Sequence, residues 1–204
     1  MNGKRVLLVL LSMMLFSIGA SAQMVKASFG VTGGGIATQM HTEPATSAPL
    51  YISGYGGLFS TVNFGELLGA RVGMNYAKQG GKYAIESVNI SVDQSYINIP
   101  ISVLVNLKSF ITVEAGLYQN ILLNSSYNEN GGDNVTISPD DGALAYNFGA
   151  LAGVSFNLGK FVFLSMKYNY GLSKSYVIHG KGYPSSAITV GLGFNIISTR
   201  KKAF

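Results

Sequence analysis

Cysteine is absent from the 204 residues of this chain, and charged residues are scarce. The absence of cysteine excludes a disulfide framework. Charged side chains make up 11% of the sequence, whereas soluble domains carry roughly 25%. Glycine, by contrast, occurs 26 times, which is nearly twice its usual share of ~7%. The composition is therefore unlike that of an ordinary soluble domain.

The chain also lacks a concentrated patch of positive charge. It carries 14 Lys and Arg against 9 Asp and Glu, a formal net charge of +5. Beyond residues 1–22, only Arg200, Lys201 and Lys202 are adjacent basic residues. Because nucleic-acid binding needs a clustered basic face, we expect no nucleic-acid partner.

Long apolar runs are missing except at the start of the chain. Residues 6–18 are almost wholly apolar, follow Lys4 and Arg5, and precede a Gly-Ala-Ser-Ala-Gln segment. This pattern predicts a secretory signal peptide over residues 1–22, cleaved after Ala22. A retained membrane anchor is the alternative, but the run is shorter than the ~20 residues of a spanning helix. No later stretch approaches ~18 apolar residues, so we expect no transmembrane helix.

Alternation of apolar and polar residues dominates the rest of the chain. A period of two predicts β-strands, and no long segment shows helical periodicity. We expect eight strands, at about 26–39, 51–63, 67–79, 94–106, 110–123, 143–158, 161–173 and 187–197.

The connections between these strands alternate in length. The short connections are 64–66, 107–109 and 159–160, and the long, polar ones are 40–50, 80–93, 124–142 and 174–186. This alternation, with an even number of strands, is typical of outer-membrane barrels with short periplasmic turns and longer extracellular loops. We therefore predict that residues 23–204 form an all-β domain, an eight-stranded, up-and-down, antiparallel transmembrane β-barrel in the outer membrane. The barrel must close, because an open strand edge in lipid leaves backbone groups unpaired.

The two faces of each strand indicate which side meets lipid. In segment 187–197 the apolar face carries Ile188, Val190, Leu192, Phe194 and Ile196. The other face carries Thr189, Gly191, Gly193 and Asn195. Small uncharged residues suit a narrow hydrated lumen, whereas the water-exposed face of a soluble barrel usually carries many charges. Segment 51–63 shows no clear assignment of its two faces.

Three charged residues lie well inside predicted strands, namely Arg71, Glu114 and Lys167. All three fall on the face that lacks large apolar residues, where they avoid the 2–4 kcal/mol or so that Lys or Arg costs in lipid. Arg71 and Glu114 each lie about five residues along a rising strand, so we predict an ion pair in the lumen, with Lys167 one layer above. Three separately hydrated charges are the alternative. Inward glycines would leave room for these side chains and for Tyr118 and Phe163.

Two further groups of residues suit a membrane barrel. Aromatic residues near the long connections predict an outer aromatic girdle: Tyr76, Tyr146, Phe148, Tyr168 and Tyr170. The last predicted strand matches the terminal-strand signal that the barrel assembly machinery recognises, at Thr189, Gly191, Phe194 and Ile196. We therefore expect outer-membrane lipid and the barrel assembly machinery as partners.

Four segments carry a resemblance to a known family. They are YAKQGGKY (Tyr76–Tyr83), YINIPISVLVNL (Tyr96–Leu107), GALAGVSFNLGK (Gly149–Lys160) and VGLGFNI (Val190–Ile196). Over nearly all of 25–197 the chain resembles the small outer-membrane β-barrel domain family, the porin-like or PorT-type proteins of Gram-negative envelopes. The resemblance implies the fold and the membrane, and it brings no catalytic motif.

Candidate catalytic and metal sites are weak in this sequence. Ser175, His179 and an acid such as Glu43 would meet only if two long connections converged. Segment 128–142 resembles a calcium-binding loop, but its twelfth position is Pro139, where that loop requires Glu. We therefore expect no catalytic, cofactor or metal site.

The expected role is an integral outer-membrane protein, structural or porin-like, with a lumen largely filled by side chains. A lipid-modifying enzyme, a small-solute channel and a soluble ligand-binding barrel remain alternatives. The sequence names no extracellular ligand.

Overall fold

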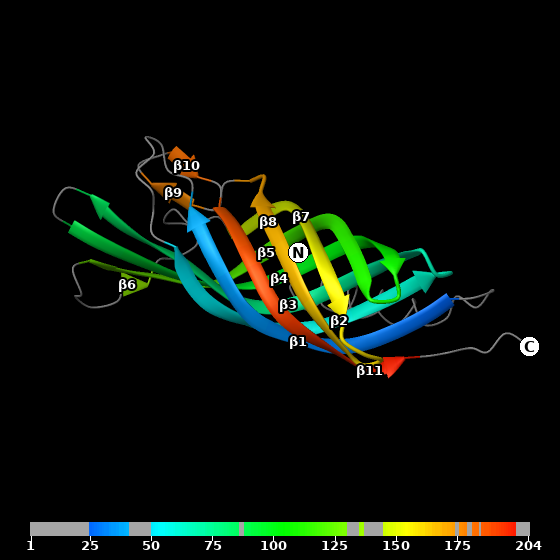
Figure 1. Ribbon diagram of the computed structural model, residues 1–204. Coiled ribbons are helices and arrows are strands. Elements are labelled where there is room, and N and C mark those ends of the chain that lie inside the picture. The colour runs from blue at the N-terminus through cyan, green and yellow to red at the C-terminus, as the bar shows by residue number, and fades with distance from the viewer. Residues whose placement is uncertain are drawn as a thin grey trace, which may run out of the picture.

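The computed structural model describes residues 25–40, 50–85, 88–129, 135–136, 145–173, 176–178, 181–183 and 185–198. Eight long antiparallel strands form a closed barrel, as predicted, and they run strongly tilted in Figure 1. These strands are β1 (Val25–Met40), β2 (Tyr51–Phe64), β3 (Leu68–Ile85), β4 (Val88–Lys108), β5 (Ile111–Glu129), β7 (Tyr146–Asn157), β8 (Val162–Gly171) and β11 (Ser185–Ser198). The predicted signal peptide lies outside the described residues.

The strand order around the barrel is β4-β3-β2-β1-β11-β8-β7-β5, and pairing of β4 with β5 completes the circle. First and last strands meet in a long antiparallel ladder, for example Gly34 with Gly191. No strand edge therefore remains open around the barrel wall, as lipid requires. Within the part of the chain that the structure describes, no helix is long and apolar enough to cross a membrane.

The outer surface of the barrel is apolar, whereas the inner surface carries mostly polar and small residues, with a few large apolar ones such as Phe59 and Leu104. Ile101, Val103 and Leu117 point outward, each with about 60% of its surface exposed. By contrast, Thr189 and Ser102 point inward and are buried. A soluble barrel would reverse this arrangement, so the orientation predicted from the alternation is confirmed.

Strand β2 had no clear assignment from sequence, and the structure places its odd-numbered residues inside. Phe59 and Thr61 are buried, whereas Ile52 is 74% exposed. The pattern was ambiguous because large aromatic side chains of β2 point into the lumen, while the small Gly54 and Gly56 lie on the outer face. Residue size therefore does not separate the two faces of β2.

Three strands are longer than the sequence analysis predicted, and the connection expected at 80–93 is wrong. Strands β3 and β4 stay paired as far as Ile85 and Val88, and β5 pairs with β4 as far as Glu129. A strand can continue beyond the membrane because cross-strand hydrogen bonds form in water as well. Polar composition was therefore a poor marker of the strand ends.

The longer strands form an extension beyond the barrel wall, visible in Figure 1 as paired strands that project past the other strands. Pairing of β3 with β2 ends at Ala77, and pairing of β5 with β7 ends at Ile121. Beyond these points β3, β4 and β5 remain paired, and β6 (Val135–Thr136) adds to β5. A short hairpin of β9 (Tyr176–Ile178) and β10 (Lys181–Tyr183) lies in the predicted connection 174–186. We call this side of the barrel the extended end.

The opposite side, which we call the tight-turn end, holds the short connections. Strand β2 leads to β3 through residues 65–67, where Gly65 has a positive φ of 72°. This left-handed conformation favours glycine. Strand β4 leads to β5 through residues 109–110, and β7 leads to β8 through 158–161. The short connections lie where the sequence predicted them.

Glycines on the inner wall lie opposite the large interior side chains. Gly193 pairs with Phe163, and a Cβ atom on Gly193 would lie 2.1 Å from the Phe163 ring. Similarly, a Cβ on Gly149 would lie 2.5 Å from the Tyr118 ring. Since real Cβ contacts are never this close, each glycine provides the space that its aromatic neighbour fills. The lumen is packed by this complementarity.

Candidate functional site

The charged residues of the inner wall meet inside the barrel. The Nη1 atom of Arg71 on β3 lies 3.2 Å from Oε2 of Glu114 on β5. The Nζ atom of Lys167 on β8 lies 2.6 Å from Oε1 of the same carboxylate. Ser102 also donates a hydrogen bond to Oε2, at 3.4 Å. We call Arg71, Glu114 and Lys167 the lumen charge cluster.

The sequence predicted that Lys167 lies one layer above the ion pair. In the structure Lys167 instead binds Glu114 directly. The register explains the difference, because Glu114 pairs with Gly153 and Gly153 pairs with Lys167. Gly153 has no side chain to separate the other two. A Cβ at this glycine would lie 2.9 Å from Cγ of Lys167, so the lysine stem occupies that space.

Arg71 is enclosed by aromatic rings as well as by polar groups. Its guanidinium carbon lies 5.3 Å from the Phe59 ring centroid and 4.9 Å from that of Phe163. These distances are typical of cation–π contacts. Its Nε atom donates to Oγ1 of Thr61 at 3.1 Å. The guanidinium is therefore held between β2, β3 and β8. We call Arg71, Phe59 and Phe163 the plug.

Burial makes this cluster energetically important. Only 1% of the Glu114 side chain is exposed, against 11% for Arg71 and 19% for Lys167. Charges removed from water interact strongly with one another, and each is costly without its partner. Two cations share one carboxylate, so the cluster carries a net charge of +1.

A second polar feature of the lumen, which sequence reasoning missed, is a chain of four asparagine side chains. Asn75 donates to Asn98 at 3.3 Å, Asn98 to Asn120 at 2.7 Å, and Asn120 to Asn147 at 2.8 Å. These residues come from β3, β4, β5 and β7, which are adjacent. The apolar–polar alternation of their own strands is enough to put Asn98 and Asn147 on the inner face, but only the register shows that the four share one row. We call this row the amide ladder.

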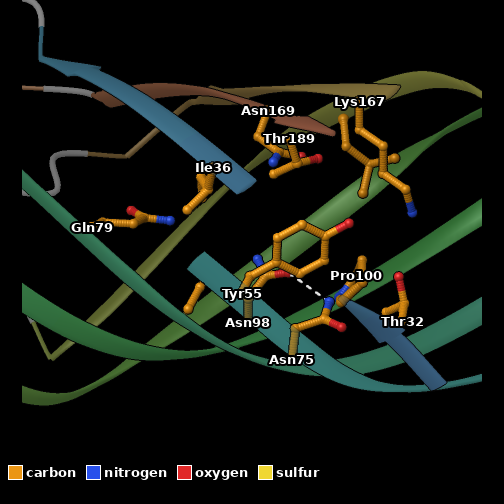
Figure 2. Close-up of a pocket in the computed structure, with 12 residues that line it drawn as sticks. Thr32, Ile36, Tyr55, Asn75, Gln79, Asn98, Pro100, Lys167, Asn169 and Thr189 are labelled. Carbon is orange, nitrogen blue, oxygen red and sulfur yellow. Dashed lines mark hydrogen bonds between the residues drawn. The ribbon is translucent and has the colours of Figure 1, made fainter. Parts of the chain in front are cut away.

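Two small cavities adjoin the cluster. The larger, drawn in Figure 2, has a volume of about 40 Å³ and is lined by residues that include Tyr55, Asn75, Asn98 and Lys167. The smaller has a volume of about 20 Å³ and contacts Arg71 as well as Lys167. A cavity needs a volume of roughly 10–15 Å³ to hold one water molecule. The spaces therefore suit single small molecules or ions.

The predicted girdle and assembly-signal residues occupy the following positions. All five girdle aromatics are exposed on the outer surface: Tyr76, Tyr146, Phe148, Tyr168 and Tyr170. In β11, Thr189 and Gly191 face the lumen, whereas Phe194 and Ile196 face outward. Their roles in the membrane and in assembly remain predictions.

The candidate catalytic residues fall outside the described part of the chain. These residues are Glu43, Ser175 and His179. Most of the candidate calcium loop 128–142 lies outside it too. Within the described residues, no group of three or more His, Cys, Asp or Glu side chains could hold a metal ion.

A closed barrel with an apolar exterior and a polar lumen defines a membrane-spanning β-barrel protein. The sequence matches the family described as "Outer membrane protein beta-barrel domain" over residues 21–177, and the chain belongs to that family. It is accordingly a protein of the bacterial outer membrane. No curated protein shows a significant match to the sequence.

Solved structures with the same fold are small outer-membrane barrels. Neisserial surface protein A (NspA) superimposes with a TM-score of 0.60 at 15% identity, covering 83% of this chain and 99% of that one. Ail, the attachment invasion locus protein of Yersinia pestis, in complex with the heparin analogue sucrose octasulfate, gives 0.52 at 11% identity, covering 84% and 99%. At these identities the similarity establishes the fold alone.

Proposed function

We propose that this protein is a closed, non-conducting outer-membrane barrel that holds the β3–β6 extension at the cell surface. The observation that carries the proposal is the filled cross-section of the lumen. Arg71 is held by Glu114 and by the rings of Phe59 and Phe163, and these groups reach the centre from four different strands. An eight-stranded barrel has an interior just wide enough for side chains to fill.

Polar contacts on both sides of the plug support the same function. On the tight-turn side, Asn106 donates to Asn63 at 3.2 Å and accepts from Thr112 at 2.8 Å. On the extended side lies the amide ladder. The Asn106–Asn63 bond connects β4 to β2 across β3, and the other bonds connect adjacent strands. Such contacts stiffen the wall and leave little space for a solute path.

The polar lining also favours a second candidate function, a small-solute channel. Purified protein in a planar bilayer distinguishes the two functions. We expect no steady conductance from the wild-type barrel, because the plug spans the lumen. A variant with alanine at Phe59, Arg71 and Phe163 serves as the unplugged reference. Steady wild-type conductance equal to that of this variant would contradict the proposal.

The orientation of the extension has its own test, which uses the absence of cysteine from the chain. Asn124 is exposed in β5 at the extended end, and Ser109 is exposed in the β4–β5 turn at the tight-turn end. On intact cells, a membrane-impermeant maleimide should label Asn124→Cys within minutes and leave Ser109→Cys unlabelled. Lysed cells should show equal labelling of both variants. The reverse pattern on intact cells would place the extension in the periplasm.

A role without catalysis is part of the proposal. The cluster contains an acid and two bases, but each charged group is bound to another, and the plug excludes a substrate from Glu114. The anchoring function needs a stable wall and an exposed extension, and the barrel supplies both. A Tyr51 hydroxyl that donates to Asp93 connects the rim of β2 to the extension on β4.

A further inference from the structure

The lumen charge cluster contains one positive charge more than its carboxylate can balance. Among the residues whose side chains the structure describes, Glu114 is the single acid on the inner wall between the two ends. Arg71 and Lys167 both lie against it. An uncompensated charge in a low-dielectric interior is destabilising, so a counter-charge nearby would stabilise the barrel.

Both cations have donors that the described residues leave unused. A guanidinium has five N–H donors and an ammonium has three. Arg71 uses one on Thr61 and one on Glu114, and Lys167 uses one on Glu114. Both side chains are mostly buried, with 11% and 19% exposed, so a small ion in an adjoining cavity would be well placed to accept from the remaining donors.

The smaller cavity lies where such a partner would bind. Arg71 and Lys167 both line it, together with Thr32, Asn75 and Ser165. Phe59, Phe163 and Pro100 form its apolar wall. Its volume of about 20 Å³ holds one particle of roughly water size. Phosphate and sulfate ions are too large for this space, whereas a halide ion is close in size to a water molecule.

We propose that this cavity is a binding site for one monovalent halide ion, held between Arg71 and Lys167. The ion would neutralise the cluster and accept the unused N–H donors. This proposal rests on the charge count and the cavity, and it does not depend on whether the barrel conducts.

The amide ladder lies beside the same site, because Asn75 lines the cavity. The Oδ1 atom of Asn75 is buried without a hydrogen-bond partner, and so is the Nδ2 atom of Asn147 at the other end. Because the O and N atoms of an amide are interchangeable by a flip, reversing all four amides keeps every ladder hydrogen bond. The unpaired atom of Asn75 is therefore an oxygen or a nitrogen depending on this flip, so the ladder does not place an obligatory negative end beside the two cations.

Unfolding of the detergent-solubilised barrel in urea tests the site, with sodium chloride replacing sodium gluconate at constant ionic strength. Gluconate is too large for the cavity. Once chloride exceeds its dissociation constant, the unfolding equilibrium constant should fall about tenfold for each tenfold rise in chloride. Crystals grown in bromide should show anomalous density between Arg71 and Lys167.

Two variants separate this site from general salt effects. Lys167→Met removes the surplus charge and should abolish the difference between chloride and gluconate. Lys78→Met removes an exposed, outward-facing lysine and should keep the difference. Equal unfolding of the wild-type barrel in both salts would overturn the proposal, as would bromide density absent from the cavity. If Lys167→Met does not fold, the bromide density and the wild-type titration still decide.

Discussion

Replacing Glu114 with alanine should lower the free energy of unfolding by about 3–5 kcal/mol, the usual cost of leaving a buried charge without its partner. Arg71 and Lys167 would then face each other across the lumen with no carboxylate between them. Both remain largely buried, with 11% and 19% of their side chains exposed. Urea unfolding in detergent micelles, with the fraction folded read from unheated gels, measures the change.

Two matched variants show whether charge is the cause. Glu66 is an exposed acid in the β2–β3 turn, and Glu66→Ala should change stability by less than about 0.5 kcal/mol. Combining Glu114→Leu with Arg71→Met and Lys167→Met removes all three charges, and apolar replacement of a buried ionic cluster is often neutral or stabilising. A triple variant as unstable as Glu114→Ala would show that packing, rather than unpaired charge, determines the loss.

Replacing Leu117 with arginine should destabilise the barrel by about 2–4 kcal/mol, because the side chain would enter the hydrocarbon near mid-depth. Leu117 is 62% exposed on the outer surface. It lies near the middle of the part of β5 that pairs with β7, which runs from Ile111 to Ile121. Unfolding of the barrel in lipid vesicles measures this cost.

The control has almost the same exposure but a different depth. Leu107 is 59% exposed and lies next to the tight-turn end of β4. Arginine there should cost only about 0–1 kcal/mol, because charged residues are tolerated near the interface. In a water-soluble barrel, both surface substitutions would stay within about 0.5 kcal/mol. Equal small effects at both positions would therefore contradict the membrane orientation.

Most of the fold could be predicted from the alternation of apolar and polar residues along each strand. In β11 the side chains from Ile188 to Ile196 alternate with small residues, and this alone placed the apolar set outside. The same rule placed Arg71, Glu114 and Lys167 inside. Strand length was less predictable, since residues 80–85 and 88–93 continue the β3–β4 ladder where polar composition had suggested a connection.

The contacts within the lumen were only partly predictable. Similar positions along rising strands brought Arg71 and Glu114 to comparable heights, but nothing local indicated that Gly153 would let Lys167 bind the same carboxylate. The inward position of Phe59 was likewise hidden, because β2 has small residues on its outer face. The amide ladder draws its members from four strands, each with only one asparagine in the row.

The sequence by itself determined how many strands cross the membrane and which face of most of them meets lipid, because side-chain direction in a strand depends only on position along that strand. Only the tertiary structure decided which inward residues touch, because that depends on the stagger between strands when the sheet closes. The lumen charge cluster, the plug and the amide ladder all arise from that stagger.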